Sequence, residues 1–217
     1  FGLPPEHVVE QAHRQNIAVG VTATCLREAQ DIARAGADFV VAQGWEAGGH
    51  RGIFDPSQPD EELPILALVR SLLDCLSIPI VAAGGMMDGR DIAAVLAAGA
   101  TAAQLGTAFL CCDEAGTARA HREALREGEE ETVFTSAFSG RPARGMRNTF
   151  IDAMADKSVL AFPQQNTLTG ALRRWAASAG DVGFQSVWAG TGRSKIRSMP
   201  AAQLMATIER ELSEAAV

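Results

Sequence analysis

The sequence lacks several features that mark whole classes of protein. No apolar stretch approaches the roughly 18 residues that a membrane-spanning helix needs, because Gly, Asp or Arg interrupts each one. Basic residues are outnumbered, with 19 Lys and Arg against 26 Asp and Glu and a net charge of −7. Proteins that bind nucleic acid usually carry a basic face, so we expect neither a nucleic acid nor a membrane as a partner.

Cysteine is also scarce, with four residues in a chain of 217. Cys111 and Cys112 are adjacent, whereas Cys25 and Cys75 stand alone. This spacing indicates neither a disulfide framework nor a metal site. We therefore expect buried or half-buried free thiols, no metal, and a reducing, cytoplasmic compartment.

Apolar residues make up 47% of the chain, which is typical of a folded protein and excludes a disordered one. Short apolar runs predict four buried strands, at 17–23, 38–43, 78–83 and 102–106. Helical spacing predicts helices, at 5–15, 26–35, 66–76, 89–98, 114–127, 166–179 and 201–214. We expect Thr24 and Asp88 to cap the two helices that follow them.

The alternation of strands and helices predicts an α/β fold with a parallel sheet covered by helices. A doubly wound sheet usually carries a GxGxxG motif after its first strand, and this sequence contains none. The alternative is a (β/α)8 TIM barrel, which needs eight strands and about 250 residues. Four strands are half of such a barrel.

The opening FGLPP resembles the end of a strand that enters a turn. We therefore expect the barrel's N-terminal half to precede this chain in the intact protein. On that interpretation residues 1–111 form the C-terminal half of a barrel. Residues 112–200 form a mainly helical substrate or lid region, and residues 201–217 form a helix that packs back on the barrel.

The loop after the second strand is rich in glycine and runs from Gln43 to Gly52, with the sequence QGWEAGGHRG. Its glycines, Gly48 and Gly49 among them, let the backbone approach a ligand closely. His50 can titrate near neutral pH and so can take a proton from a carbon acid. The alternative is a glycine-rich turn that carries a surface histidine.

Two further loops follow the third and fourth strands. One contains Gly84 and Gly85, and the other is Gln104-Leu105-Gly106-Thr107. In a barrel these would be the loops after strands seven and eight, where backbone N–H groups commonly hold a phosphate. The pair predicts a phosphorylated ligand, and FMN fits this expectation.

Long runs of the chain resemble one enzyme family. They are DFVVAQGWEAGGHRG, PIVAAGGMMDGRDIAAVLAAGATAAQLGTAFL, TVFTSAFSGRPARGMRNTFI, PQQNTLTGALRR and FQSVWAGTG. These runs closely resemble the nitronate monooxygenases, formerly called 2-nitropropane dioxygenases. The QGxEAGGHxG motif is shared with the FMN-dependent enoyl-acyl-carrier-protein reductases, so it specifies the cofactor better than the substrate.

The resemblance implies an FMN-bound (β/α)8 barrel with a helical substrate domain. It implies that His50 is the catalytic base. Residues of the two glycine turns would line the flavin, namely Gln43, Gly48, Gly49, Gly84 and Gly85. Four successive residues would hold its phosphate end, namely Gln104, Leu105, Gly106 and Thr107.

The implied reaction is the oxidation of an alkyl nitronate, or of a nitroalkane that His50 has deprotonated, by FMN and molecular oxygen. Arg51 and the SGRPARGMRN segment resemble the nitronate branch more than the reductase branch. The alternatives are an NAD(P)H-dependent, FMN-containing enoyl reductase and a flavin-binding fragment without turnover.

A polar cluster in the same segment has two interpretations. It consists of Arg141, Arg144, Arg147 and Asn148. One arginine could lie near an anionic substrate or the flavin phosphate. The composition favours the second interpretation, a solvated loop whose arginines pair with the many carboxylates nearby.

Overall fold

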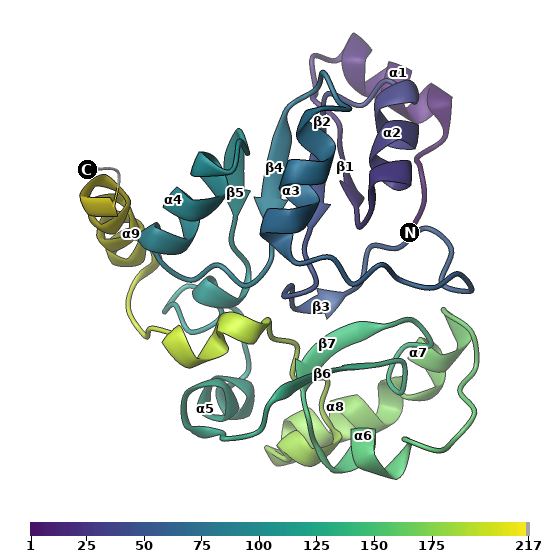
Figure 1. Cartoon of the computed structure of the whole chain (residues 1–217). Helices are drawn as coiled ribbons and strands as arrows, with labels where there is room; N and C mark the ends of the chain where they lie inside the picture. The colour runs from purple at the N-terminus through teal and green to yellow at the C-terminus, as the bar shows by residue number, and fades with distance from the viewer. Residues whose placement is uncertain (216–217) are drawn as a thin grey trace. The chain divides into compact units, whose positions relative to one another are not determined.

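A computed structural model describes residues 1–215 and divides them into two compact units. Unit 1 comprises residues 1–46, 52–105 and the described residues from Ile208 onward. Unit 2 comprises residues 47–51 and 106–207. Figure 1 shows the course of the chain through the elements of both units.

Unit 1 contains a parallel sheet of four strands within the described residues. The strands are β1 (Gly20–Ala23), β2 (Phe39–Gln43), β4 (Ile80–Ala83) and β5 (Ala102–Gln104). Each of the four predicted strands is therefore confirmed, although each is shorter than its apolar run. The spatial order is β1-β2-β4-β5, so the strands of this sheet lie side by side in the order in which they follow one another along the chain.

This sheet order bears on the two parallel folds weighed from the sequence. In a doubly wound sheet the strand order reverses at a switch point, where the ligand binds. The four strands of unit 1 show no reversal in the described residues. The structure therefore confirms the α/β class with a parallel sheet and does not support a doubly wound arrangement of these strands.

Helices connect the strands of unit 1 and form its remaining elements. They are α1 (Glu6–Arg14), α2 (Leu26–Arg34), α3 (Ile65–Leu73) and α4 (Gly89–Ala97), and α9 (Ala201–Ala215) continues into this unit from unit 2. All five were predicted to within a few residues. Of the predicted 201–217 segment, residues 216 and 217 lie outside the described part of the chain.

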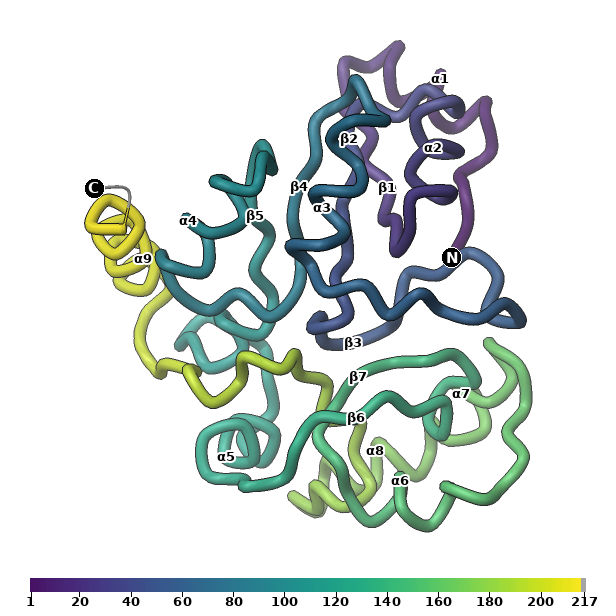
Figure 2. The backbone as a smooth tube through the Cα atoms, in the orientation of Figure 1, coloured from purple at the N-terminus to yellow at the C-terminus, as the bar shows by residue number. Residues whose placement is uncertain are grey.

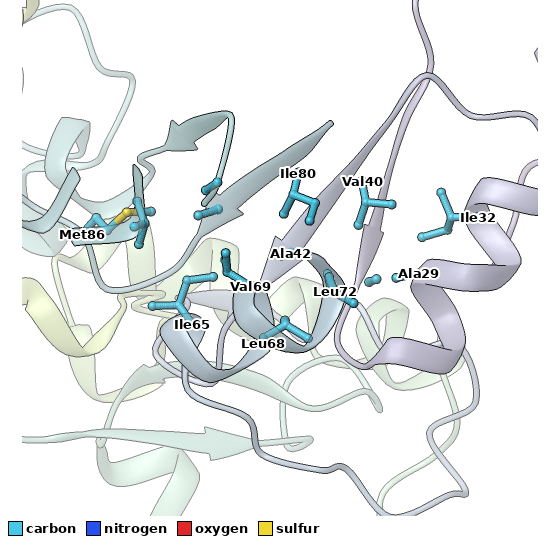
Figure 3. Close-up of a cluster of buried hydrophobic side chains, with 14 of the residues drawn as sticks. Ala29, Ile32, Val40, Ala42, Ile65, Leu68, Val69, Leu72, Ile80 and Met86 are labelled. Carbon is cyan, nitrogen blue, oxygen red and sulfur yellow. The ribbon is translucent and has the colours of Figure 1, made fainter. Parts of the chain in front are cut away.

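The core of unit 1 lies between the sheet and helices α2 and α3. Leu68 and Leu72 of α3 are fully buried beside Val40 of β2 and Ile80 of β4. Ile32 of α2 extends the same cluster, as the close-up in Figure 3 shows. Strands that are apolar on their covered face thus pack against helices with apolar residues three and four positions apart, as parallel sheets require.

A buried carboxylate fixes the start of α2 in a way that the sequence analysis did not foresee. Thr24 was predicted to cap this helix, but the N-cap is Cys25, whose side chain makes no capping hydrogen bond. The Glu28 carboxylate instead accepts hydrogen bonds from the Thr24 N–H (2.7 Å) and Oγ1 (2.8 Å). It also accepts one from the Phe54 N–H at 2.6 Å. Glu28 therefore joins the β1–α2 turn to the long loop that follows residue 52.

The start of α4 agrees with the sequence. Asp88 is its N-cap and accepts a hydrogen bond from the Asp91 N–H at 2.9 Å. Gly89, the first helical residue, donates its N–H to Glu211 of α9 at 3.0 Å. A Cβ at Gly89 would collide with the backbone of Leu212, so glycine allows α9 to lie directly against this helix end.

Unit 2 contains a small antiparallel sheet that the sequence did not reveal. Its strands are β3 (Gly49–His50), β6 (Thr132–Thr135) and β7 (Ala143–Met146), in the order β3-β7-β6. Its longer helices are α5 (Arg119–Glu127), α6 (Thr149–Ala153), α7 (Gln164–Leu168) and α8 (Gly170–Ala179). Helices α7 and α8 replace the single helix predicted over 166–179. Figure 2 traces β6 and β7 as adjacent segments.

Three of the four cysteines are buried, and all four are free thiols. Cys111 packs with Leu125, Met146 and Val187 in the core of unit 2. Burial raises the pKa of Cys111 and of Cys112, so both stay protonated near neutral pH. Cys75 departs from the expectation of burial because it is exposed.

Two features are absent from residues 1–215. No helix there is both long and apolar enough to cross a membrane. No group of three or more His, Cys, Asp or Glu residues there could hold a metal ion.

We predict that Glu28→Gln lowers the free energy of unfolding by about 1–3 kcal/mol, the usual cost of leaving a buried polar group unpaired. An amide offers one oxygen in place of two, and its NH2 group would face an N–H donor of Thr24 or Phe54. Urea denaturation of the whole protein measures the loss. Glu10→Gln is the control, because Glu10 forms an exposed pair with Arg14, and it should change stability by less than about 0.5 kcal/mol. Equal effects of the two substitutions would contradict the proposal that the Glu28 carboxylate joins Thr24 to Phe54.

Candidate functional site

The carboxyl ends of three strands in unit 1 align in one row. The parallel register pairs Gln43 of β2 with Ala83 of β4, and Ala83 with Gln104 of β5. The loops that begin at Gly84 and Leu105 therefore start at the same edge of the sheet as Gln43. This is the edge at which parallel α/β folds build their sites.

The Gly84–Gly85 turn requires glycine on backbone grounds. Its φ angles are +128° and +72°, in the region that residues with a Cβ rarely adopt. The turn leads into α4, where the Met87 N–H donates to Asp91 at 2.9 Å. The local conformation therefore explains these glycines whether or not a ligand approaches them.

The first part of the QGWEAGGHRG loop anchors unit 1. Gln43 accepts a hydrogen bond from the Gly52 N–H through Oε1 at 2.7 Å. The Glu46 carboxylate accepts the Ile65 N–H at 3.0 and 3.2 Å, where it caps the first turn of α3 and complements the helix dipole. A Cβ on Gly44 would meet the Ile65 side chain at 2.6 Å. No local sequence pattern indicates the role of Glu46, because its partner lies 19 residues along the chain.

Residues 47–51 contain β3 (Gly49–His50), an edge strand of the sheet in unit 2. Gly49 and His50 pair with Arg144 and Ala143 of β7, and the Arg51 N–H donates to the Pro142 carbonyl at 2.9 Å. Gly49 has a φ of +75°. This pairing, rather than a surface turn, sets the position of His50.

Gly48 and Thr107 meet the same short segment of unit 2. A Cβ on Gly48 would collide with the backbone of Ala189 and Gly190. The Gly190 N–H donates to Thr107 Oγ1 at 2.9 Å. The sequence placed Gly48 and Thr107 in the site but did not single out Gly190, which contacts both.

His50 is half-buried among aromatic rings. Its Nε2 lies 2.8 Å from Ser139 Oγ. The ring of Trp188 lies 5.6 Å away and that of Phe162 6.4 Å away, both in edge-to-face arrangements. The alternative of a surface histidine is therefore wrong.

The electrostatic surroundings of His50 keep its imidazole neutral. Burial lowers its pKa, and the positive charges of Arg141 and Arg173 lower it further. A neutral imidazole is the form that can accept a proton. The guanidinium of Arg173 is held by the Asn166 carbonyl (2.7 Å) and side chain (2.8 Å).

The arginine cluster does not form a solvated loop, so this expectation is corrected. Arg141 and Arg144 are only 9% and 5% exposed. Arg144 lies over the Phe134 ring at 4.2 Å and donates to Thr132. Arg147 does behave as expected, because it is exposed and pairs with Asp152. Arg144 lies in β7 and is buried there, which an irregular sequence pattern could not indicate.

Gly106 differs from the other candidate glycines. Its φ of −116° is open to any residue, and no heavy atom lies within 4 Å of the position that a Cβ would occupy. It is exposed and precedes the 3-10 turn η1 (Thr107–Phe109). Neither backbone strain nor packing therefore explains a glycine here.

Comparisons with known proteins agree with one another. A family model described as nitronate monooxygenase matches residues 1–211. A nitronate monooxygenase of Paraburkholderia phytofirmans is 44% identical over 99% of this chain, and one of Pseudomonas aeruginosa is 45% identical over 98%. The chain spans 60% and 62% of the length of these two relatives.

Two solved structures are similar over the full chain. Nitroalkane oxidase from Streptomyces ansochromogenes has a TM-score of 0.95 at 43% identity, and this chain covers 63% of it. FabK from Thermotoga maritima has a TM-score of 0.81 at 30% identity, and this chain covers 68% of it.

We predict that Arg173→Gln raises the pKa of His50 toward the ordinary value of 6.5, because a positive charge that opposes protonation is removed. An NMR titration of the imidazole in the whole protein measures the change. Because folding lowers the pKa of His50, the free energy of unfolding falls as the pH drops below 6.5. This acid-induced loss should be smaller in Arg173→Gln than in the wild type. Arg174→Gln, an exposed neighbour on α8, should leave the His50 titration in place. A shift of equal size in both variants would contradict the specific role of Arg173.

Proposed function

Because this chain belongs to the nitronate monooxygenase family, we propose that the protein oxidises alkyl nitronates, and nitroalkanes after removal of their α-proton, with FMN and molecular oxygen. The observation that carries the proposal is the neutral, half-buried His50 within a chain that the family model matches over residues 1–211. The substrate is a small nitronate or nitroalkane, and molecular oxygen is the co-substrate.

The residues at the strand ends fit a flavin phosphate. Three strands of unit 1 end in one row, and the positive φ angles at Gly84 and Gly85 turn the backbone there without side chains. The open space beside Gly106 is a place that a Cβ would fill and an anion could use. FMN, when bound, would supply the two-electron acceptor, and oxygen would accept the electrons in turn.

We assign the cofactor contacts residue by residue. They are Gln43, Gly48, Gly49, Gly84, Gly85, Gln104, Leu105, Gly106 and Thr107. Two of these side chains also have structural partners, because Gln43 Oε1 holds Gly52 and Thr107 Oγ1 holds Gly190. Backbone N–H groups are therefore the principal donors that we assign to the phosphate.

His50 is assigned as the base that takes the α-proton of a neutral nitroalkane. Loss of this proton leaves a nitronate anion. The positive charges of Arg141 and Arg173 act on His50, so they also favour an anion formed beside it. The aromatic rings of Trp188 and Phe162 reduce the access of water to the imidazole.

The same reasoning extends to the fold and the location. Four parallel strands in chain order support a (β/α)8 barrel of which this sheet forms part, with 1–111 as barrel, 112–200 as substrate or lid region and 201–217 as the returning helix. Four free thiols support a reducing, cytoplasmic location.

Oxygen uptake separates the proposal from its alternatives. The whole, flavin-loaded protein should consume oxygen with a primary alkyl nitronate in the absence of NAD(P)H. Oxidation of NAD(P)H with an enoyl thioester, and no uptake with nitronate, would favour the reductase instead. Flavin absorbance without turnover of either substrate would indicate a flavin-binding protein.

We predict that His50→Asn lowers kcat/KM for the neutral nitroalkane by roughly 10² to 10⁴-fold, the usual contribution of a positioned general base, and that of the preformed nitronate much less. Only the neutral form has a proton for His50 to remove. The measurement is the ratio of the two kcat/KM values at equal flavin occupancy, in wild type and variant. An unchanged ratio would reject His50 as the base.

We predict that Gly106→Val weakens FMN retention by roughly tenfold or more, the equivalent of one lost hydrogen bond to a charged group, while thermal stability of the apoprotein stays unchanged. Gly106 is the clean position for this test, because a side chain at Gly85 would strain a backbone with φ of +72°. Gly116→Val is the matched control, since Gly116 is also exposed with open space beside it. Equal flavin content in the two variants after gel filtration would overturn the phosphate assignment.

A further inference from the structure

Ser139 is a buried hydroxyl whose oxygen points at the imidazole of His50. Its side chain is 1% exposed, and Oγ lies 2.8 Å from His50 Nε2. The two residues are 89 positions apart in the sequence, so tertiary structure alone brings them together. Nothing in the sequence pattern singled out Ser139.

The remaining contacts of Ser139 decide which way its hydroxyl proton points. The Arg141 N–H lies 3.3 Å from Oγ, and the Arg141 carbonyl oxygen lies 3.2 Å from it. A serine hydroxyl has one donor and two acceptor positions. The carbonyl can only accept, so all three contacts are hydrogen bonds only when the hydroxyl donates to this carbonyl. Oγ then accepts from the Arg141 N–H and from a hydrogen on His50 Nε2.

The loop that carries Ser139 is held from both sides. Gln165 of α7 donates its side-chain N–H to the Ala137 carbonyl at 2.7 Å. Thr169 donates its hydroxyl to the Phe138 carbonyl at 2.6 Å. Gly140 takes a φ of +83°, and a Cβ there would collide with the backbone of Leu160. The hydroxyl is thus preorganised by the hydrogen bonds that Gln165 and Thr169 make to its loop.

We propose that Ser139 is a positioning residue that holds His50 in the tautomer with its hydrogen on Nε2, which makes Nδ1 the basic nitrogen. The proposal rests on the proposed function, in which His50 takes the α-proton. A histidine tautomer is set by the hydrogen bond that its other nitrogen makes.

The charges that face His50 cannot make this choice. Arg141, on the same loop as Ser139, and Arg173, on α8, both act on His50 as positive charges. They oppose the doubly protonated imidazolium, but neither tautomer of the neutral ring carries a net charge. A directional hydrogen bond can favour one tautomer over the other, and the Ser139 hydroxyl supplies such a bond.

The test compares Ser139→Ala and Ser139→Thr in the whole, flavin-loaded protein. With ¹⁵N-labelled histidine, the wild type should show His50 protonated at Nε2 alone, and Ser139→Ala should show a mixture of both tautomers. In Ser139→Ala, kcat/KM for the neutral nitroalkane should fall roughly tenfold, as expected for one lost hydrogen bond, while that for the nitronate changes little. Ser139→Thr keeps the hydroxyl and should restore both readouts.

Gln165→Leu controls for simple loosening of the loop. It removes the bond to Ala137 but keeps the Ser139 hydroxyl, so it should leave the tautomer unchanged and affect both substrates alike. A single Nε2 tautomer in Ser139→Ala would overturn the proposal, as would a wild-type spectrum with the hydrogen on Nδ1. The NMR spectra report the tautomer whether or not the protein turns over substrate. Failure of the base assignment would appear separately, as an unchanged ratio of the two kcat/KM values in His50→Asn.

Discussion

The pairing of Gly49 and His50 with β7 is the constraint on which the candidate site depends. Two residues of a long loop join an antiparallel sheet whose other strands lie more than 80 positions later in the chain. Backbone hydrogen bonds fix the strand register, and register fixes the face to which each side chain points. His50 is therefore held as a strand residue with a defined environment.

Glycine serves different physical needs at different positions of this site. Gly48 is small because another backbone segment lies against it, and Gly84 and Gly85 adopt backbone angles that disfavour a Cβ. Neither reason applies to Gly106, which has open space beside it and a φ angle that any residue can adopt. A glycine with no structural explanation is a better indicator of a ligand than one that a turn requires.

The four parallel strands, most helices and the Asp88 cap could be predicted because each depends on residues close in sequence. The apolar runs of β2 and β4 and the helical spacing of α2 and α3 identify a parallel α/β sheet without any long-range information. The β6–β7 hairpin escaped prediction because its inward residues include Arg144, which packs on Phe134 rather than facing solvent. The prediction that Thr24 caps α2 was wrong because its N–H and hydroxyl donate to the Glu28 carboxylate instead.

By itself the sequence determined the parallel α/β class, the glycine-rich loops at the strand ends and a histidine suited to proton transfer. These depend on periodicity and on residue chemistry, which are local properties. The tertiary structure alone decided that His50 is half-buried, that Arg141 and Arg173 lower its pKa, and that Ser139 meets its Nε2. A pKa and a hydrogen-bond partner depend on what surrounds a side chain, and here the surroundings come from segments about 90 to 140 residues away along the chain.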